Sequence, residues 1–338
     1  MAKNLSSIQS ESQNDSPNNR TSNKLMQLVQ TLELNSVNHK NLEEIGIIKE
    51  SDFIYKAPND FIEQIQINNL NDPLLKQILP VKAENQLAID FVKDPVGDLQ
   101  KNPTPSLIHK YQGRVLLIAS PKCDIHCRYC FRRHFPYEEQ SNQRHWQAAI
   151  QQITHDKSIH EVILSGGDPM SLSEAVLMRL IESIEQIKHI TTIRIHSRTP
   201  IVSPSTAPQK ALLIWAQQSR LNKVLVVHCN HANELSDKTA ALLQQYRQSG
   251  FTLLNQSVLL KDINDSANTL AELSHKLFSQ GVLPYYLHQL DKVQGASHFE
   301  VSDSDAKQIH EQLLTQLPGY LVPKLVREIA GQQSKTPL

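Results

Sequence analysis

The chain has 338 residues with 34 basic and 34 acidic side chains, so it carries no formal net charge at neutral pH. This balance argues against the basic surface that nucleic-acid binding requires. No apolar run approaches the roughly 20 residues of a membrane span, and the polar N-terminus is unlike a signal peptide. We therefore expect a cytoplasmic protein that binds neither nucleic acid nor membrane, built as one large domain with an appended piece or as two domains.

The first part of the chain lacks a regular pattern of strands. Residues 1–22 are polar and poor in large apolar side chains, which predicts a disordered or loosely docked tail. Residues 23–109 are interrupted by six prolines, and their apolar spacing favours short helices at 25–34, 59–67 and 73–79. We interpret residues 23–109 as a helical cap that leads into the core.

From residue 110 onward, strand and helix patterns alternate. Six Val/Ile/Leu-rich runs are too short for buried helices and lack clean alternation, as expected for strands buried on both faces. The expected strands are 114–119, 160–164, 192–196, 223–228, 252–258 and 282–288, and the expected helices are 144–153, 173–187, 208–218, 237–248, 267–280 and 303–317.

Local signals mark the ends of several expected helices. Ser171 and Glu174 have the spacing of a capping box, while Gly250 and Gly281 stand where helices end. Six successive βα units predict a parallel sheet, either open or curved into a partial barrel. Polar motifs follow successive strands, as expected for a site at the carboxyl ends of the strands.

Three of the four cysteines, Cys123, Cys127 and Cys130, lie in one short run with the spacing C-x3-C-x2-C. Three thiolates are one too few for a closed zinc site or a fully ligated iron–sulfur cluster. A [4Fe–4S] cluster held by three cysteines leaves one iron open to a small molecule. A zinc site completed by His126 or His134 is the alternative, whereas a disulfide framework is disfavoured because the cysteines are too few for this length.

This cysteine spacing, directly after an apolar strand, resembles the signature of the radical S-adenosylmethionine (SAM) enzymes. The stretch 114–133, which ends in Arg132 and Arg133, is similar to the lysine 2,3-aminomutases, in particular to the compact members that serve modification of translation elongation factor P. The resemblance extends from about residue 60 to the end. It implies an α/β fold: a partial (β/α)6 radical SAM barrel over residues 110–338, with an N-terminal helical cap and a C-terminal segment that binds pyridoxal 5′-phosphate (PLP).

The resemblance also assigns residues to three cofactors. Cys123, Cys127 and Cys130 would bind the [4Fe–4S] cluster, whose open iron SAM would chelate. Lys335 matches the lysine that bonds to PLP, although residues 332–334 replace glycines of the family segment. The other implied cofactor contacts are the turn Gly166, Gly167 and Asp168 for SAM; Lys110, Tyr111 and Arg114 for the PLP phosphate, with Lys110 in place of a common arginine; and His228 and Gln256 near PLP and SAM.

The substrate residues follow from the same resemblance. Arg132 matches an arginine that pairs with the substrate α-carboxylate, while Asp291 and Glu328 match two carboxylates that hold the ε-ammonium of lysine. The implied activity is an isomerase that converts L-α-lysine to (R)-β-lysine, with electrons from a flavodoxin- or ferredoxin-like donor. A separate ligase would attach the product to elongation factor P, and the enzyme would be a monomer or a homo-oligomer.

Two other readings remain open from the sequence. The first is a radical SAM enzyme that acts on another amino acid, in which Lys335 binds no PLP. The second is a non-catalytic module of the translation apparatus that carries a metal ion or a cluster.

Overall fold

A single sheet organises the computed structural model, which describes residues 17–34, 46–48, 51, 53–140 and 143–338. Its nine strands lie side by side in chain order. Strands β2 to β8 are parallel, while β1 and β9 pair antiparallel at the two edges, so the sheet is an open partial barrel. The strands are β1 Leu107–Tyr111, β2 Arg114–Ser120, β3 Glu161–Gly166, β4 Thr192–Ser197, β5 Asn222–His228, β6 Phe251–Val258, β7 Leu283–His288, β8 Lys324–Arg327 and β9 Thr336–Pro337.

The six expected strands correspond to β2 through β7. The edge strands β1 and β9 were not predicted. The six expected helices are also present, with ends shifted by a few residues. The helices of this part are α5 Tyr137–Gln140, α6 Gln143–His155, α7 Glu174–Glu185, α8 Thr199–Val202, α9 Lys210–Gln218, α10 Asp237–Gln248, α11 Ala267–Ser279 and α12 Asp303–Gln316. Short 3-10 turns occur at Lys82–Asn85, Leu99–Lys101, Pro169–Ser171, Ala232–Glu234, Ser297–Phe299 and Gly319–Leu321.

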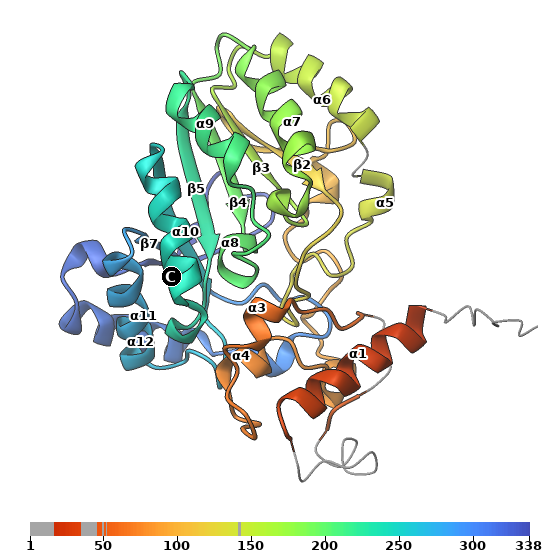
Figure 1. The fold of residues 1–338 in the computed structure, drawn as a ribbon, viewed down its shortest axis with the longest axis vertical. Coiled ribbons are helices and arrows are strands. Elements are labelled where there is room, and N and C mark those ends of the chain that lie inside the picture. Colours follow the sequence, from red (N-terminus) through yellow and green to blue (C-terminus); the bar gives the residue numbers. More distant parts are fainter. Residues whose placement is uncertain (1–16, 35–45, 49–50, 52, 141–142) are drawn as a thin grey trace, which may run out of the picture.

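One apolar row crosses the sheet and belongs to a buried core that includes side chains of the connecting helices. Figure 1 shows these helices packed along the sheet. Each member of the row lies in register with the next one, and burial of each such side chain contributes about 1.5–3 kcal/mol to folding. The row consists of Leu117, Leu164, Ile195, Leu225 and Leu253.

The opposite face of the sheet is more polar than expected. Strand β4 alternates between buried Ile193 and Ile195 and the partly exposed Arg194 and His196. Strand β6 alternates in the same way. The expectation of strands without alternation was therefore wrong for β4 and β6, because the inner face of a partial barrel is lined by side chains available to a ligand rather than by a second apolar layer.

The cap lies at the carboxyl ends of the strands. In Figure 1 its helices α1 (Pro17–Thr31), α3 (Asn59–Ile62) and α4 (Pro73–Lys76) gather at the end toward which β5 points. Helix α1 begins inside the segment expected to be a tail, whose residues 1–16 lie outside the described part. Helices α3 and α4 are shorter than predicted. Asp72 caps α4 by accepting hydrogen bonds from the N–H groups of Leu74 and Leu75.

The expected capping box does not form. Helix α7 begins after Ser173, and the Glu174 carboxylate accepts hydrogen bonds from the N–H groups of Ala211 and Leu212 at the start of α9. Glu174 therefore joins two helices instead of closing its own. Gly250 and Gly281 do follow the ends of α10 and α11, with φ angles of +92° and +78° that favour glycine.

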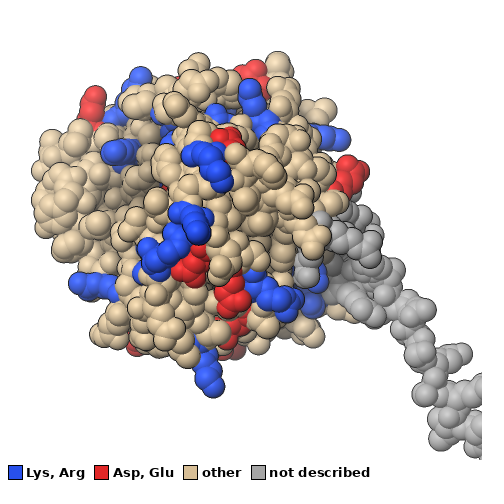
Figure 2. Space-filling view, turned by 90° about the horizontal axis from the view of Figure 1, so that it is seen from above, with Lys and Arg blue, Asp and Glu red and all other residues tan. Residues whose placement is uncertain are grey.

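The surface agrees with the balanced charge of the sequence. On the face shown in Figure 2, basic and acidic side chains are interspersed. Within the described residues, no helix combines the length and the apolar character needed to cross a membrane.

Candidate active site

The cysteine loop follows β2 and is held by the cap. Lys56 Nζ donates to the Cys123 carbonyl at 2.5 Å, and the His126 N–H donates to the Lys56 carbonyl at 2.9 Å. The Arg128 N–H donates to the Gln77 carbonyl at 2.9 Å. The cap therefore fixes the backbone of this loop at three points.

The three thiols of this loop converge. Burial raises the pKa of Cys123 well above its ordinary value, and the charges of Asp168, Cys130 and Cys127 raise it further. Burial and the neighbouring Cys127 likewise raise the pKa of Cys130 to about 11. Such a group of thiolates needs a positive centre to remain ionised together, so its chemistry fits an iron–sulfur cluster with three protein ligands.

The two candidate zinc ligands point elsewhere. The His126 ring stacks on Phe53 and its Nδ1 lies 2.8 Å from the Ile54 carbonyl, while His134 Nε2 lies 3.2 Å from the Gln294 carbonyl. Among the described residues, no three His, Cys, Asp or Glu side chains have the arrangement that one metal ion requires.

The turn after β3 packs directly on the start of the cysteine loop. A Cβ on Gly167 would lie 2.4 Å from the Lys122 carbonyl oxygen, and one on Gly166, whose φ is +113°, would lie 2.9 Å from the Ser120 carbonyl oxygen. These glycines are therefore required by close approach of two backbones. Their contact with SAM remains a prediction.

Asp168 joins the ends of β3 and β4. Its carboxylate accepts hydrogen bonds from Ser197 Oγ at 2.6 Å and from the N–H groups of Arg198 and Thr199 at 2.7 and 2.9 Å. A fourth comes from the Met170 N–H at 2.9 Å. This carboxylate is thus occupied by the protein itself and positions the two loops.

A second set of charges connects the residues predicted for substrate and PLP. Lys335 Nζ lies 2.9 Å from Glu328, and Lys110 Nζ lies 3.5 Å from the other oxygen of Glu328. Lys110 Nζ also lies 2.6 Å from Asp98, which accepts a hydrogen bond from Arg132 Nε at 2.8 Å. These five residues, which we call the lysine-site network, form one continuous chain of ion pairs.

The carboxylates near Lys335 differ in their ionisation. Burial opposes charge on Glu328 and Asp98, but the adjacent cations outweigh it and hold the pKa of both carboxyls below their ordinary values. For Asp291, burial raises the pKa to about 7, against the opposing influence of Lys335. Asp291 makes no side-chain hydrogen bond to any described residue, so its charge depends on what enters the site.

The predicted phosphate-binding group contacts this network. Tyr111 Oη donates to Glu328 at 2.7 Å, and the Arg114 guanidinium lies over the Tyr111 ring at 4.6 Å. Lys110 and Tyr111 are therefore paired with carboxylates, and binding of a phosphate by this group remains a prediction.

His228 and Gln256 are neighbours in register on β5 and β6, and Gln256 is in register with Tyr286 on β7. Lys335 Nζ lies 5.7 Å from the centre of the Tyr286 ring, which connects this row to the lysine-site network. Burial lowers the pKa of His228 to about 3, so its imidazole is neutral.

Sequence reasoning missed three residues of this site. Asp98 lies in the proline-interrupted cap, where no periodic signal singles it out. His196 is the last residue but one of β4, and His288 is the last residue of β7. Burial lowers the pKa of both imidazoles, with further lowering by the charges of Arg194 and Lys335 at His196 and of Lys335 at His288. Their position at strand ends was the available signal.

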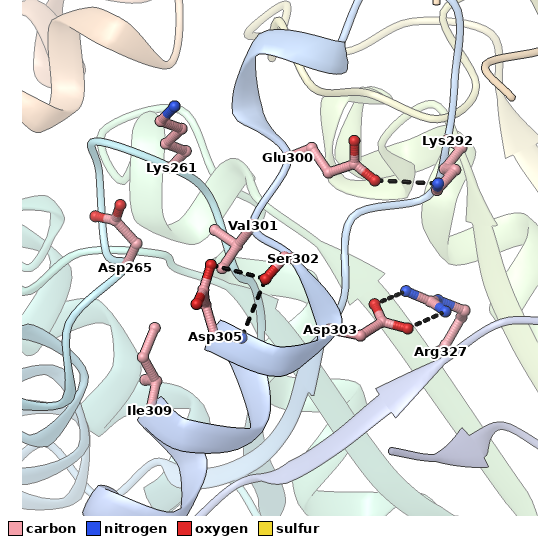
Figure 3. Close-up of a pocket in the computed structure, with 10 residues that line it drawn as sticks. All are labelled: Lys261, Asp265, Lys292, Glu300, Val301, Ser302, Asp303, Asp305, Ile309 and Arg327. Carbon is pink, nitrogen blue, oxygen red and sulfur yellow. Dashed lines mark hydrogen bonds and ion pairs between the residues drawn. The ribbon is translucent and has the colours of Figure 1, made fainter. Parts of the chain in front are cut away.

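A separate hollow of about 640 Å³ is lined in part by Arg327 of β8 and by residues around the start of α12 (Figure 3). Arg327 forms an ion pair with Asp303 there, and Lys292 pairs with Glu300 at 3.1 Å. Arg327 thus lines this hollow, whereas the next residue, Glu328, belongs to the lysine-site network. The hollow and the network have no residue in common.

An open parallel sheet with three thiols in one loop at its carboxyl end is the arrangement expected of a radical SAM partial barrel. A family model described as "4Fe-4S single cluster domain" matches residues 112–200. The solved structure of a radical SAM methyltransferase from Sphaerobacter thermophilus superimposes with a TM-score of 0.46 and 15% identity, over 67% of this chain and 72% of that one.

Two relatives show the family to which the chain belongs. The "L-lysine 2,3-aminomutase" of Escherichia coli (strain K12) is 49% identical over 287 residues, which is 85% of this chain and 83% of the relative. That of Haemophilus influenzae is 46% identical over 285 residues, which is 84% of each. The chain belongs to the radical SAM lysine 2,3-aminomutase family. It is therefore an isomerase, whose cofactors include a [4Fe–4S] cluster and SAM.

Proposed function

We propose that this chain converts L-lysine to β-lysine by moving the amino group from C2 to C3, with PLP as a further cofactor. The supporting observation is the lysine-site network, which connects the Arg132 guanidinium to Glu328 and Lys335, together with Asp291, whose carboxyl lies within the electrostatic influence of Lys335 and Glu328. A cation at one end and anions at the other match an amino acid with a long cationic side chain. The side chain of glutamate would be repelled by the same anions.

Arg132 would bind the substrate α-carboxylate. Its Nε is held by Asp98 at 2.8 Å and its Nη1 lies 3.3 Å from Ser165 Oγ, so the rest of the guanidinium fork is available. Glu328 and Asp291 would bind the ε-ammonium. Glu328 is paired with the ammonium of Lys335, and a substrate ammonium offers the same chemical group in exchange.

Lys335 would hold PLP, with Lys110, Tyr111 and Arg114 at its phosphate. PLP supplies, when bound, an aldehyde that bonds to amines and a ring that delocalises an unpaired electron. The cluster and SAM together supply a carbon radical that abstracts hydrogen. The protein residues hold one C–H bond of the substrate in reach of that radical by fixing both ends of the substrate.

The wider role extends the resemblance found in the sequence. We propose that the product is (R)-β-lysine, that it is formed in the cytoplasm with electrons from a flavodoxin- or ferredoxin-like protein, and that a separate ligase attaches it to elongation factor P. Mass spectrometry of elongation factor P from cells that lack this enzyme tests this role, and an unchanged modification would contradict it.

An anaerobic turnover assay tests the reaction itself. The protein is reconstituted with iron, sulfide and PLP, then given L-lysine, SAM and dithionite, and the products are separated against β-lysine standards. β-Lysine that requires both SAM and PLP is the expected result. Cleavage of SAM without β-lysine, from protein with a full cluster, would exclude lysine as the substrate, and L-arginine and L-ornithine would be tested next.

A further inference from the structure

Arg198 is a buried arginine directly after β4 that the proposed reaction does not use. Its Nη1 donates to Cys127 Sγ at 2.6 Å and to Tyr129 Oη at 2.5 Å. Its Nη2 donates to Gln77 Oε1 at 2.7 Å and to Glu234 Oε2 at 2.9 Å. The residue is only 6% exposed; its contacts with Tyr129, Gln77 and Glu234 are buried, and the one with Cys127 is partly buried.

The surroundings hold this guanidinium in one orientation. The fully buried Glu234 accepts hydrogen bonds through Oε1 from the N–H groups of Asn230 and His231, so its second oxygen is directed at Arg198. The backbone N–H of Arg198 donates to Asp168 at 2.7 Å. The backbone of Arg198 and the Nη2 side of its guanidinium are thus both held. The Nη1 side is therefore already oriented toward the Cys127 thiol, and the side chain needs no further ordering.

We propose that Arg198 raises the reduction potential of the cluster bound by Cys127. Addition of an electron makes the cluster more negative, and a guanidinium that donates a hydrogen bond to a ligating sulfur stabilises that added charge. Because Arg198 is buried and its contact with Cys127 is partly buried, water screens this charge less than it would at the surface. The negative charge of Glu234 partly offsets the positive charge of Arg198, so the two residues shift the reduction potential of the cluster in opposite directions.

This inference rests on the cluster assignment and not on PLP or lysine. The contact also joins the cluster to the cap, because Gln77 lies just after α4 and accepts from the same guanidinium. Arg198 is thus a positioning residue that acts on the cluster through a ligand.

The test is an anaerobic redox titration of the reconstituted cluster, followed by electron paramagnetic resonance, without substrate or PLP. Arg198→Met should make the midpoint potential more negative at full iron and sulfide content. Glu234→Gln should shift it in the opposite direction, because the guanidinium loses its counter-charge. Arg194→Met is the matched control. Arg194 lies in β4, shortly before Arg198, and is paired with Glu161, so its removal should leave the potential unchanged.

The two shifts of opposite sign distinguish tuning from a purely structural role. Unchanged potentials in Arg198→Met and Glu234→Gln, with clusters intact, would overturn the proposal. Shifts of the same sign would overturn it as well. If Arg198→Met loses the cluster, Arg198→Lys is measured in its place and should shift the potential in the negative direction, since lysine lacks the fork that contacts both Glu234 and Cys127. Loss of the cluster in every variant would show that Arg198 is structural.

Discussion

Two of the charged networks among the described residues, one behind the cysteine loop and one around Lys335, differ in how completely their side chains are paired. Behind the loop, the fully buried Arg128 donates to both oxygens of Glu84, to the Phe53 carbonyl and to Ser51, so its donors are used by the protein. Around Lys335, Asp291 has no hydrogen-bonded partner among the described residues.

This difference separates scaffold from binding site. The first network is closed, so breaking it should be felt in stability and in cluster content. The second network lies beside Asp291, whose carboxyl accepts no hydrogen bond from a described residue, so substitutions there should be felt in affinity and turnover. The following variants test that division, beginning with the largest expected effect.

Lys335→Ala and Cys127→Ala should both abolish β-lysine formation, but only Cys127→Ala should abolish cluster content. Without Lys335 the cysteine loop is untouched, so iron and sulfide content should equal that of the wild type while β-lysine formation is lost. Without Cys127 the cluster loses one of its three ligands, so cluster content, SAM cleavage and turnover should all be lost. Iron and sulfide analysis beside the turnover assay measures this, and wild-type turnover by Lys335→Ala would contradict the assignment of PLP.

Arg128→Met should lower the free energy of unfolding by about 3–5 kcal/mol, because it leaves the buried Glu84 carboxylate without its main counter-charge. Urea unfolding followed by circular dichroism measures the change. The control is Arg327→Met, which breaks the more exposed pair with Asp303 and should cost less than about 1 kcal/mol. Equal losses in the two variants would refute the distinction.

Asp291→Asn should weaken lysine binding about a hundredfold at pH 8, the effect of removing a partly desolvated charge partner. In the free enzyme the pKa of Asp291 is about 7, and a bound ammonium favours the ionised carboxylate. Lysine should therefore bind the wild type more tightly as pH rises through 7 and more weakly as it falls. Calorimetric titration across this range measures it, and a pH dependence that survived in Asp291→Asn would rule out this carboxyl as its source.

Asp98→Asn should raise the KM for lysine about tenfold, because Arg132 keeps its charge but loses an ionised partner that orients it. Asp98→Glu should restore part of the loss, and the exposed Asp90→Asn serves as the control. A change in kcat alone, with KM unaltered, would argue against a role in orienting Arg132.

Local order along the chain could be predicted because it depends on neighbouring residues. Apolar runs of strand length located β2 through β7, and glycines located the ends of α10 and α11. The short edge strands were missed because β1 and β9 acquire their structure only by pairing with β2 and β8. The capping box failed for a related reason, since Glu174 found partners on another helix.

The sequence by itself determined the cysteine loop, the order of strands and helices, and the candidate residues at strand ends, because these follow from spacing within short segments. Only the tertiary structure decided which charges neutralise one another. Asp98 meets Arg132 across 34 residues, and Arg198 meets Cys127 across 71. Such pairs are set by the geometry of the open sheet and its cap, and no local spacing encodes them.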